Sequence, residues 1–145
     1  MKSLLASASL AILVMSYLPA ASADMLVCDL HFSNGQSLKS VPVATTLPQM
    51  EKGLSQRKDI GPGMLFAWPQ AELRTFWMRD TWVPLSIGFF DEAGKLFKIE
   101  DMQPNSDTHH ESGLPARYAL ELAAGQYPIV GLRPGDFLSV GECKK

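Results

Sequence analysis

Apolar and polar residues alternate between residues 26 and 32, where the apolar set is Leu26, Cys28, Leu30 and Phe32. A period of two places these side chains on one face of an extended strand. The dipeptide Asn34-Gly35 follows, which is preferred in tight hairpin turns. The pattern therefore predicts a strand that turns at Asn34-Gly35 and pairs with a second strand at residues 37–43.

A short helix is predicted after this hairpin. Thr46 provides an N-cap, Pro48 stands in the first turn, and Gly53 marks the end. One or two helical turns fit between Thr46 and Gly53.

The remaining chain reads as short strands separated by turn residues. Strands are expected at residues 64–68, 74–80, 85–90, 95–102, 118–122 and 137–140. Asp91 to Gly94 suits a hairpin loop, residues 103–115 read as a long exposed loop, and residues 123–132 as an irregular or briefly helical crossover. Many short strands with little helix predict a mainly β fold, a single-domain β-sandwich or partly open barrel with one or two short helices.

The first 23 residues have the pattern of a cleavable signal peptide. Lys2 precedes an apolar run, and Ala21 and Ala23 stand at positions −3 and −1 of a signal-peptidase site. A membrane anchor is the alternative, but the run contains several polar residues and is shorter than the roughly 20 residues that a span requires. We expect residues 24–145 to form one domain, periplasmic or secreted, with no transmembrane anchor after cleavage.

Charge and cysteine content limit the expected partners and predict a covalent link. The chain has 13 Lys and Arg against 15 Asp and Glu, with no basic run, so nucleic acid is not an expected partner. Cys28 and Cys143 are its two cysteines. Export would place both in an oxidising compartment, which favours a disulfide between the ends of the domain. Free thiols or metal ligands are the alternative, although neither CxxC spacing nor a flanking histidine is present.

Several segments occur in an order that resembles the DUF192 family of small, uncharacterised bacterial and archaeal proteins. They are Gly53-Leu54, Arg57, residues 63–66 (GMLF), residues 76–81 (FWMRDT), Pro84-Leu85, Asp101-Met102 and residues 118–122 (YALEL). The resemblance implies a mostly β, sandwich-like fold, often behind a secretion signal, with no established activity. Two positions depart from the family pattern: Ser86 replaces a common acidic residue, and Asp80 replaces a common asparagine.

The densest group of candidate functional residues lies at positions 76–82. On a strand, Trp77 and Arg79 would share one face, where an indole and a guanidinium together form a recognition surface for carboxylates or phosphates. We expect Trp77, Arg79, Asp80 and Thr81 to build a binding surface, with Asp101 and Glu121 as neighbours. The structural alternative is that Trp77 packs under a loop while Arg79 pairs with Asp80, Asp101 or Glu121.

Acidic residues leave open a second hypothesis, a carboxylate-based hydrolase. Glu121 alternates with Leu120 and Leu122, and carboxylates near apolar faces can have raised pKa values. A pair drawn from Glu100, Asp101 and Glu121 could act as a glycosidase does. Pairing with an arginine is the structural alternative.

Copper binding is a third hypothesis. Thioether and imidazole ligands suit Cu(I), and the chain offers Met50, Met64, Met78 and Met102 with His109 and His110. The methionines are not clustered and could simply fill the core, and the two histidines could be solvated loop residues. No nucleophile motif accompanies any histidine.

These observations favour a non-catalytic module over an enzyme. The expected partner is a small ligand, an envelope polymer or a protein, and neither a cofactor nor a metal is assigned to the site.

Overall fold

The computed structural model describes residues 24–145, so the predicted signal peptide at residues 1–23 lies outside the described residues. The chain forms β1 (Leu26–Phe32), β2 (Ser37–Ala44), α1 (Leu47–Lys52), β3 (Met64–Glu72), β4 (Thr75–Phe76), β5 (Leu85–Phe90), β6 (Leu96–Met102), β7 (His110–Glu111), β8 (Ala116–Ala123), α2 (Gln126–Val130) and β9 (Leu138–Lys144). Strands dominate and both helices are short, which confirms the predicted mainly β class. Within this part of the chain, no helix has the length and apolar character needed to cross a membrane.

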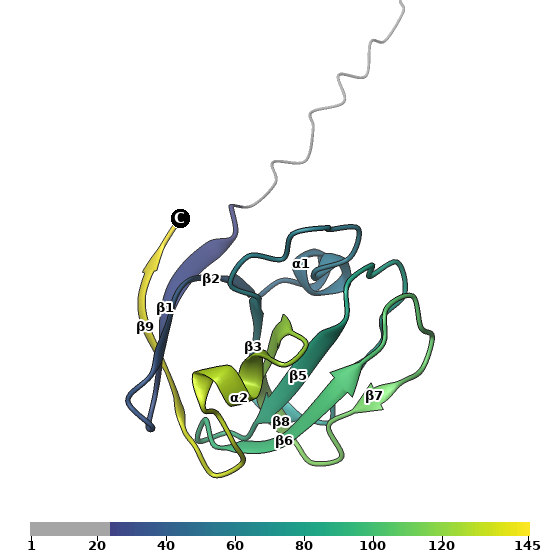
Figure 1. Ribbon diagram of the computed structural model, residues 1–145. Helices are drawn as coiled ribbons and strands as arrows, with labels where there is room; N and C mark the ends of the chain where they lie inside the picture. The colour runs from purple at the N-terminus through teal and green to yellow at the C-terminus, as the bar shows by residue number, and fades with distance from the viewer. Residues whose placement is uncertain (1–23) are drawn as a thin grey trace, which may run out of the picture.

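Seven of the strands form one curled sheet in the order β6-β5-β8-β3-β2-β1-β9 (Figure 1). The β2–β3 pair is parallel, and the other neighbours are antiparallel. The two edges of the sheet approach each other at an isolated bridge between Lys95 and Phe137. The sheet does not close into a complete barrel, in agreement with the predicted open form. Strands β4 and β7 make a separate small sheet.

The local signals between residues 26 and 53 work as expected. The β1–β2 hairpin pairs Leu26 with Val43, and Gly35 takes the positive φ of 85° that its turn requires. Helix α1 is N-capped by Thr46, whose backbone N–H donates to the Gln49 side chain at 3.2 Å, and it ends at Gly53. The predicted hairpin and helix are both confirmed.

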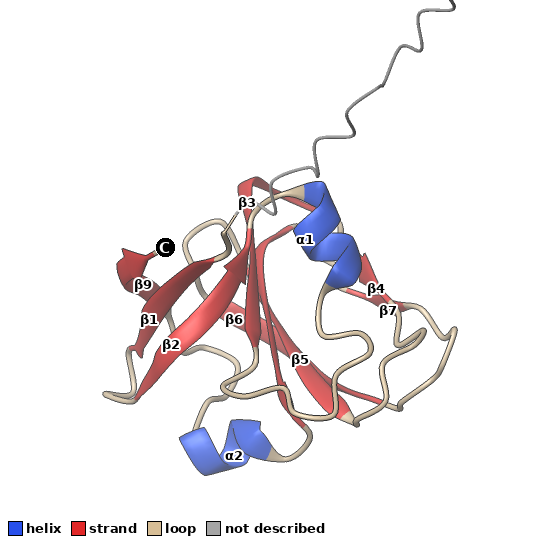
Figure 2. Ribbon diagram, turned by 90° about the horizontal axis from the view of Figure 1, so that it is seen from above, coloured by secondary structure: helices blue, strands red, loops and turns tan. Residues whose placement is uncertain are grey.

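The two faces of the sheet bury different hydrophobic clusters. Leu120 and Leu122 of β8 belong to one cluster together with Tyr127 of α2, whose hydroxyl donates to the Leu120 carbonyl at 2.7 Å. Met64, Phe66, Ile87 and Phe89 belong to the other, against which Met50 of α1 packs. The two helices lie on different sides of the sheet (Figure 2). Because side chains alternate along a strand, Glu121 faces the second cluster, on the side of α1.

Two predicted segments differ from the structure. The strand predicted at residues 74–80 is limited to β4, because the chain turns directly afterwards: Thr81 N–H donates to the Met78 carbonyl at 3.1 Å, and Asp80 has a φ of 53°. Residues 103–115 are not wholly an exposed loop, because β7 pairs with β4 there and buries His110. The expectation that His110 is solvated was therefore wrong.

A disulfide joins Cys28 and Cys143, as predicted, with an S–S distance of 2.00 Å. The two cysteines are directly opposite each other on β1 and β9. The bond therefore links β1 to β9 between two cysteines that are 115 residues apart in the sequence.

Candidate functional site

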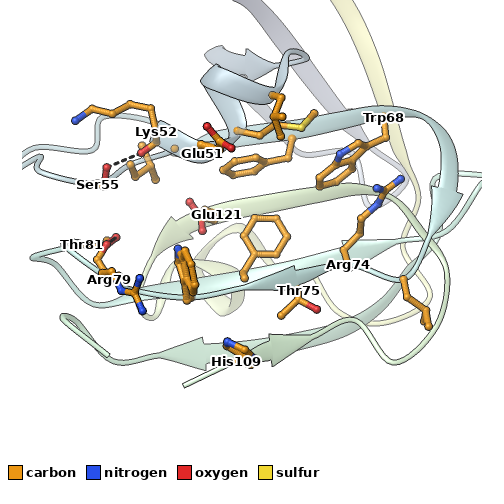
Figure 3. A pocket seen from close by; sticks show the side chains of 18 residues that line it. Glu51, Lys52, Ser55, Trp68, Arg74, Thr75, Arg79, Thr81, His109 and Glu121 are labelled. Carbon is orange, nitrogen blue, oxygen red and sulfur yellow. Dashed lines mark hydrogen bonds between the residues drawn. The ribbon is translucent and has the colours of Figure 1, made fainter. Parts of the chain in front are cut away.

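An open cavity of about 540 Å³ lies between α1, β3 and the chain from residue 73 to residue 81. Figure 3 shows the side chains that line it. Its volume falls within the range of small-molecule sites. Helix α1 forms one wall, and Glu121 of β8 lies on the floor formed by the sheet.

Four aromatic side chains line the cavity. Phe66 and Trp68 are two residues apart on β3 and therefore share a face. Phe76 of β4 packs edge-on against both, with ring centroids 5.0 Å from Phe66 and 6.2 Å from Trp68. Trp77 follows it and lies beside His109, with ring centroids 6.2 Å apart. These contacts fix a broad apolar wall to which a flat or cyclic group could bind.

Two arginines stack on the two tryptophans of the wall, but they differ in how firmly other contacts hold them. The Arg74 guanidinium is 4.2 Å from the Trp68 ring centroid, and it also donates to the carbonyls of Ala116 and Gln70. The Arg79 guanidinium is 4.3 Å from the Trp77 centroid, and its Nε is 2.8 Å from Asp107. Arg79 and Asp107 are both largely exposed, so Arg79 can exchange this partner for a ligand at little cost.

The Glu121 carboxyl is buried without a partner. The residue is 5% exposed and lies between Met64 of β3 and Ile87 of β5. Among residues 24–145, no group donates a hydrogen bond to this carboxyl or forms an ion pair with it. Burial alone raises its pKa to about 8. At neutral pH the cavity floor therefore carries mostly a neutral carboxylic acid.

The structure brings together four of the six predicted binding residues. Trp77, Arg79, Thr81 and Glu121 line the cavity. Asp80 lies between Arg79 and Thr81 in the sequence but is not part of the cavity lining. The expected ion-pair partners of Arg79 were wrong, because its carboxylate partner is Asp107.

Asp101 does not line the cavity because the register between β5 and β6 places it on the other face of the sheet. It pairs with Ser86 across β5 and β6 and accepts a hydrogen bond from the Ser86 hydroxyl at 2.6 Å. Ile87, the next residue, is the one opposite Glu121. Since neighbouring residues point to opposite faces, Asp101 and Glu121 lie on different sides of the sheet.

Glu100 lies on the same face as Glu121, with Ile87 between them. It does not line the cavity, and it is held by Lys98 and by His110 Nδ1, each at 2.7 Å. Burial raises its pKa, but the hydrogen bonds from Lys98 and His110 outweigh that effect and hold the pKa below its ordinary value. Glu100 is thus a partnered, ionised carboxylate, whereas Glu121 is not.

Sequence reasoning missed much of the cavity wall. Phe66, Trp68, Arg74 and His109 all line it, and α1 contributes Met50 and Glu51. One signal was available, namely the i, i+2 spacing of Phe66 and Trp68 on a strand. The approach of α1 and His109 depends on tertiary structure, for which the sequence gives no local pattern.

The methionines of the copper hypothesis are part of, or pack against, one hydrophobic cluster. Met64, Met78 and Met102 are buried in the second hydrophobic cluster, and Met50 lines the cavity. Within residues 24–145, no group of three or more His, Cys, Asp or Glu side chains is placed to hold a metal ion. Copper binding stays an untested prediction.

Comparisons with known proteins place this architecture in a family. A crystal structure of a protein of unknown function from Novosphingobium aromaticivorans DSM 12444 superposes with a TM-score of 0.72 at 26% identity, covering 84% of this chain and 89% of that one. A second, from Sinorhizobium meliloti 1021 and described as "a putative transcription regulator", gives a TM-score of 0.70 at 32% identity, covering 80% of this chain and 92% of that one.

No curated protein matches the chain. The sequence profile of DUF192, described as "Uncharacterized ACR", matches residues 30–140. That range contains every strand from β2 to β8 and the floor and walls of the cavity. The chain belongs to the DUF192 family.

Proposed function

We propose that this protein works outside the cytoplasm, in the periplasm or after secretion, as a non-catalytic module that binds a small, partly apolar organic ligand in the cavity beside α1. The observation that carries the proposal is the combination of a preformed aromatic wall with two available polar groups, the exposed Arg79 and the unpartnered Glu121. Small-molecule sites have this composition, an apolar lining with a few polar groups that fix orientation.

The rim of the cavity supports a ligand with an apolar body. Leu47 is 68% exposed, Leu73 is 69% exposed and Trp77 is about half exposed. All three line the opening. A bound ring would remove this apolar surface from water, which is favourable at about 25 cal/mol per Å².

The charge of the chain supports the same choice of partner. A formal net charge of −2 without a basic run gives little attraction for a polyanion. We therefore do not propose a nucleic acid as the partner of this chain, although the Sinorhizobium relative is described as "a putative transcription regulator". The disulfide between Cys28 and Cys143 supports a location outside the cytoplasm.

The test is an NMR titration with 2-phenylethanol as a neutral ring probe. The chain has three tryptophans, and their indole N–H signals report on different places. Trp68 and Trp77 line the cavity, whereas Trp82 is exposed and lies outside its lining. We expect the signals of Trp68 and Trp77 to shift saturably while that of Trp82 stays fixed. Equal shifts of all three signals, or none, would contradict the proposal.

A further inference from the structure

The floor of the cavity contains a polar group that the fold itself does not use. Glu121 is 95% removed from solvent, yet its neighbours across the sheet, Met64 and Ile87, are apolar. Its carboxyl oxygens are not fully enclosed by protein and open on the cavity. A ligand that displaces water from this carboxyl must supply a hydrogen bond in its place.

The groups that surround Glu121 determine what that partner can be. The titratable side chains lining the cavity come from several elements: Glu51 and Lys52 from α1, Arg74 from the β3–β4 connection, Arg79 from the chain after β4, and His109 before β7. Tyr127 lies behind the sheet, near the Leu120 carbonyl. Three of the lining side chains are Lys or Arg and two are Glu, one of them the largely buried Glu121, so the cavity is more favourable to an anion than to a cation.

A neutral carboxylic acid has an O–H that can donate, and an ionised one has only acceptors. Given the proposed function, on which this inference rests, we propose that Glu121 in its neutral form donates a hydrogen bond to an anionic oxygen of the ligand, so that the cavity selects organic oxyacids over amines of the same shape. The ligand class is thus a small carboxylate or similar oxyacid with an apolar ring.

The anionic head and the ring would be recognised by different residues. The head accepts from Glu121 and from Arg79, which gives up the exposed carboxylate of Asp107. The ring packs on Phe66 and Phe76, the edge-to-face pair of the wall. Hydrogen bonds to charged groups are stronger than those between neutral groups, so they can set specificity between heads of equal size.

Three probes of nearly equal shape separate the head groups: phenylacetate, 2-phenylethanol and 2-phenylethylamine. Their dissociation constants are measured by NMR titration of the oxidised protein at pH 7. We expect phenylacetate to bind about tenfold or more tightly than the amine, with the alcohol between them. Raising the pH from 7 to 9 ionises Glu121, so phenylacetate should bind about tenfold more weakly at pH 9.

Two variants assign this pH dependence to Glu121. Glu121→Gln keeps a buried N–H donor and cannot ionise, so it should bind phenylacetate with the same affinity at pH 7 and pH 9. Glu121→Leu removes the donor and should weaken phenylacetate by about tenfold or more, and 2-phenylethanol by a smaller factor because its hydroxyl is uncharged. A pH dependence that persists in Glu121→Gln would arise from another lining group and would overturn the assignment.

The outcomes separate this inference from the proposed function. Tightest binding by the amine, or loss of phenylacetate binding in Glu121→Gln, would overturn the oxyacid inference while leaving the cavity as a binding site. Failure of all three probes to shift Trp68 and Trp77 would overturn both.

Discussion

The Arg79 guanidinium lies 4.3 Å from the centroid of the Trp77 ring while its Nε is 2.8 Å from Asp107. The arginine is thus oriented by an aromatic face on one side and by an exposed carboxylate on the other. Trp77 and Arg79 line the cavity and Asp107 does not, so a ligand in the cavity can replace the exposed carboxylate as the partner of Arg79.

Replacing this arginine should affect binding far more than folding. Arg79→Ala removes a largely exposed side chain, so the free energy of unfolding should fall by about 1 kcal/mol or less. Phenylacetate should bind about tenfold more weakly, because a charge-assisted hydrogen bond is lost. Denaturation curves and NMR titrations measure the two effects. Arg133→Ala, at an exposed arginine outside the cavity, is the matched control and should change neither quantity.

Burial of Glu121 makes stability depend on pH with a definite sign. Its pKa is about 8 in the folded protein and near 4.5 in the unfolded chain, so between these values the folded state binds the extra proton. The free energy of unfolding should therefore fall as pH rises from about 5 to 8, by a few kcal/mol in total. Above pH 8 this group adds no further slope.

Glu121→Gln should remove that slope, and denaturant unfolding at pH 5, 6.5 and 8 measures it. The wild-type and variant curves should converge toward acid pH and separate toward pH 8, with the variant relatively more stable there. Parallel profiles for the two proteins would mean that Glu121 is ionised, or solvated, throughout the range.

The close contact between β5 and α2 gives a packing prediction. A Cβ at Gly88 would overlap the Tyr127 hydroxyl, which donates to the Leu120 carbonyl. Gly88→Ala should therefore destabilise the protein by about 1–3 kcal/mol. In a Tyr127→Phe background the same change should be less damaging but still destabilising, because the overlapping oxygen is gone while the ring carbon Cζ, 2.7 Å from the added Cβ, remains. Additive effects of the two substitutions would argue against this contact.

The fold was largely predictable because its main signals are local. Asn34-Gly35 and the alternation before it specify the first hairpin, and Thr46 with Gly53 specifies α1. The strand predicted at residues 74–80 failed because its aromatic residues resemble a strand, although the chain turns at Asp80. The pairing of β7 with β4 depends on residues far apart in sequence, for which no local pattern exists.

The site was predictable only in part. Trp77 and Arg79 could be predicted because an indole and a guanidinium two residues apart form a recognisable binding pattern. Glu121 could be predicted because it is an acidic residue between apolar neighbours. Asp101 was misplaced since its face depends on the register between β5 and β6, which a single sequence does not reveal. Trp68 and Arg74 were missed because their stacking depends on tertiary structure, which a single sequence does not reveal.

The disulfide should contribute strongly to stability but not to binding. Closing a loop of 115 residues stabilises a protein by about 4–5 kcal/mol on chain-entropy grounds. The Cys28→Ala, Cys143→Ala double variant should lose about that much in denaturant unfolding. Neither cysteine lines the ligand cavity, so phenylacetate affinity should persist wherever the variant is folded. An unchanged unfolding midpoint, or free thiols in the unreduced wild type, would contradict the bond.

The most direct measurement of the central claim is a crystal structure of the oxidised protein with phenylacetate at pH 7. The ring should lie against Phe66 and Phe76, with a carboxylate oxygen within hydrogen-bond distance of Glu121 and near Arg79. A cavity filled by the protein's own side chains, or phenylacetate bound only elsewhere on the surface, would contradict the account.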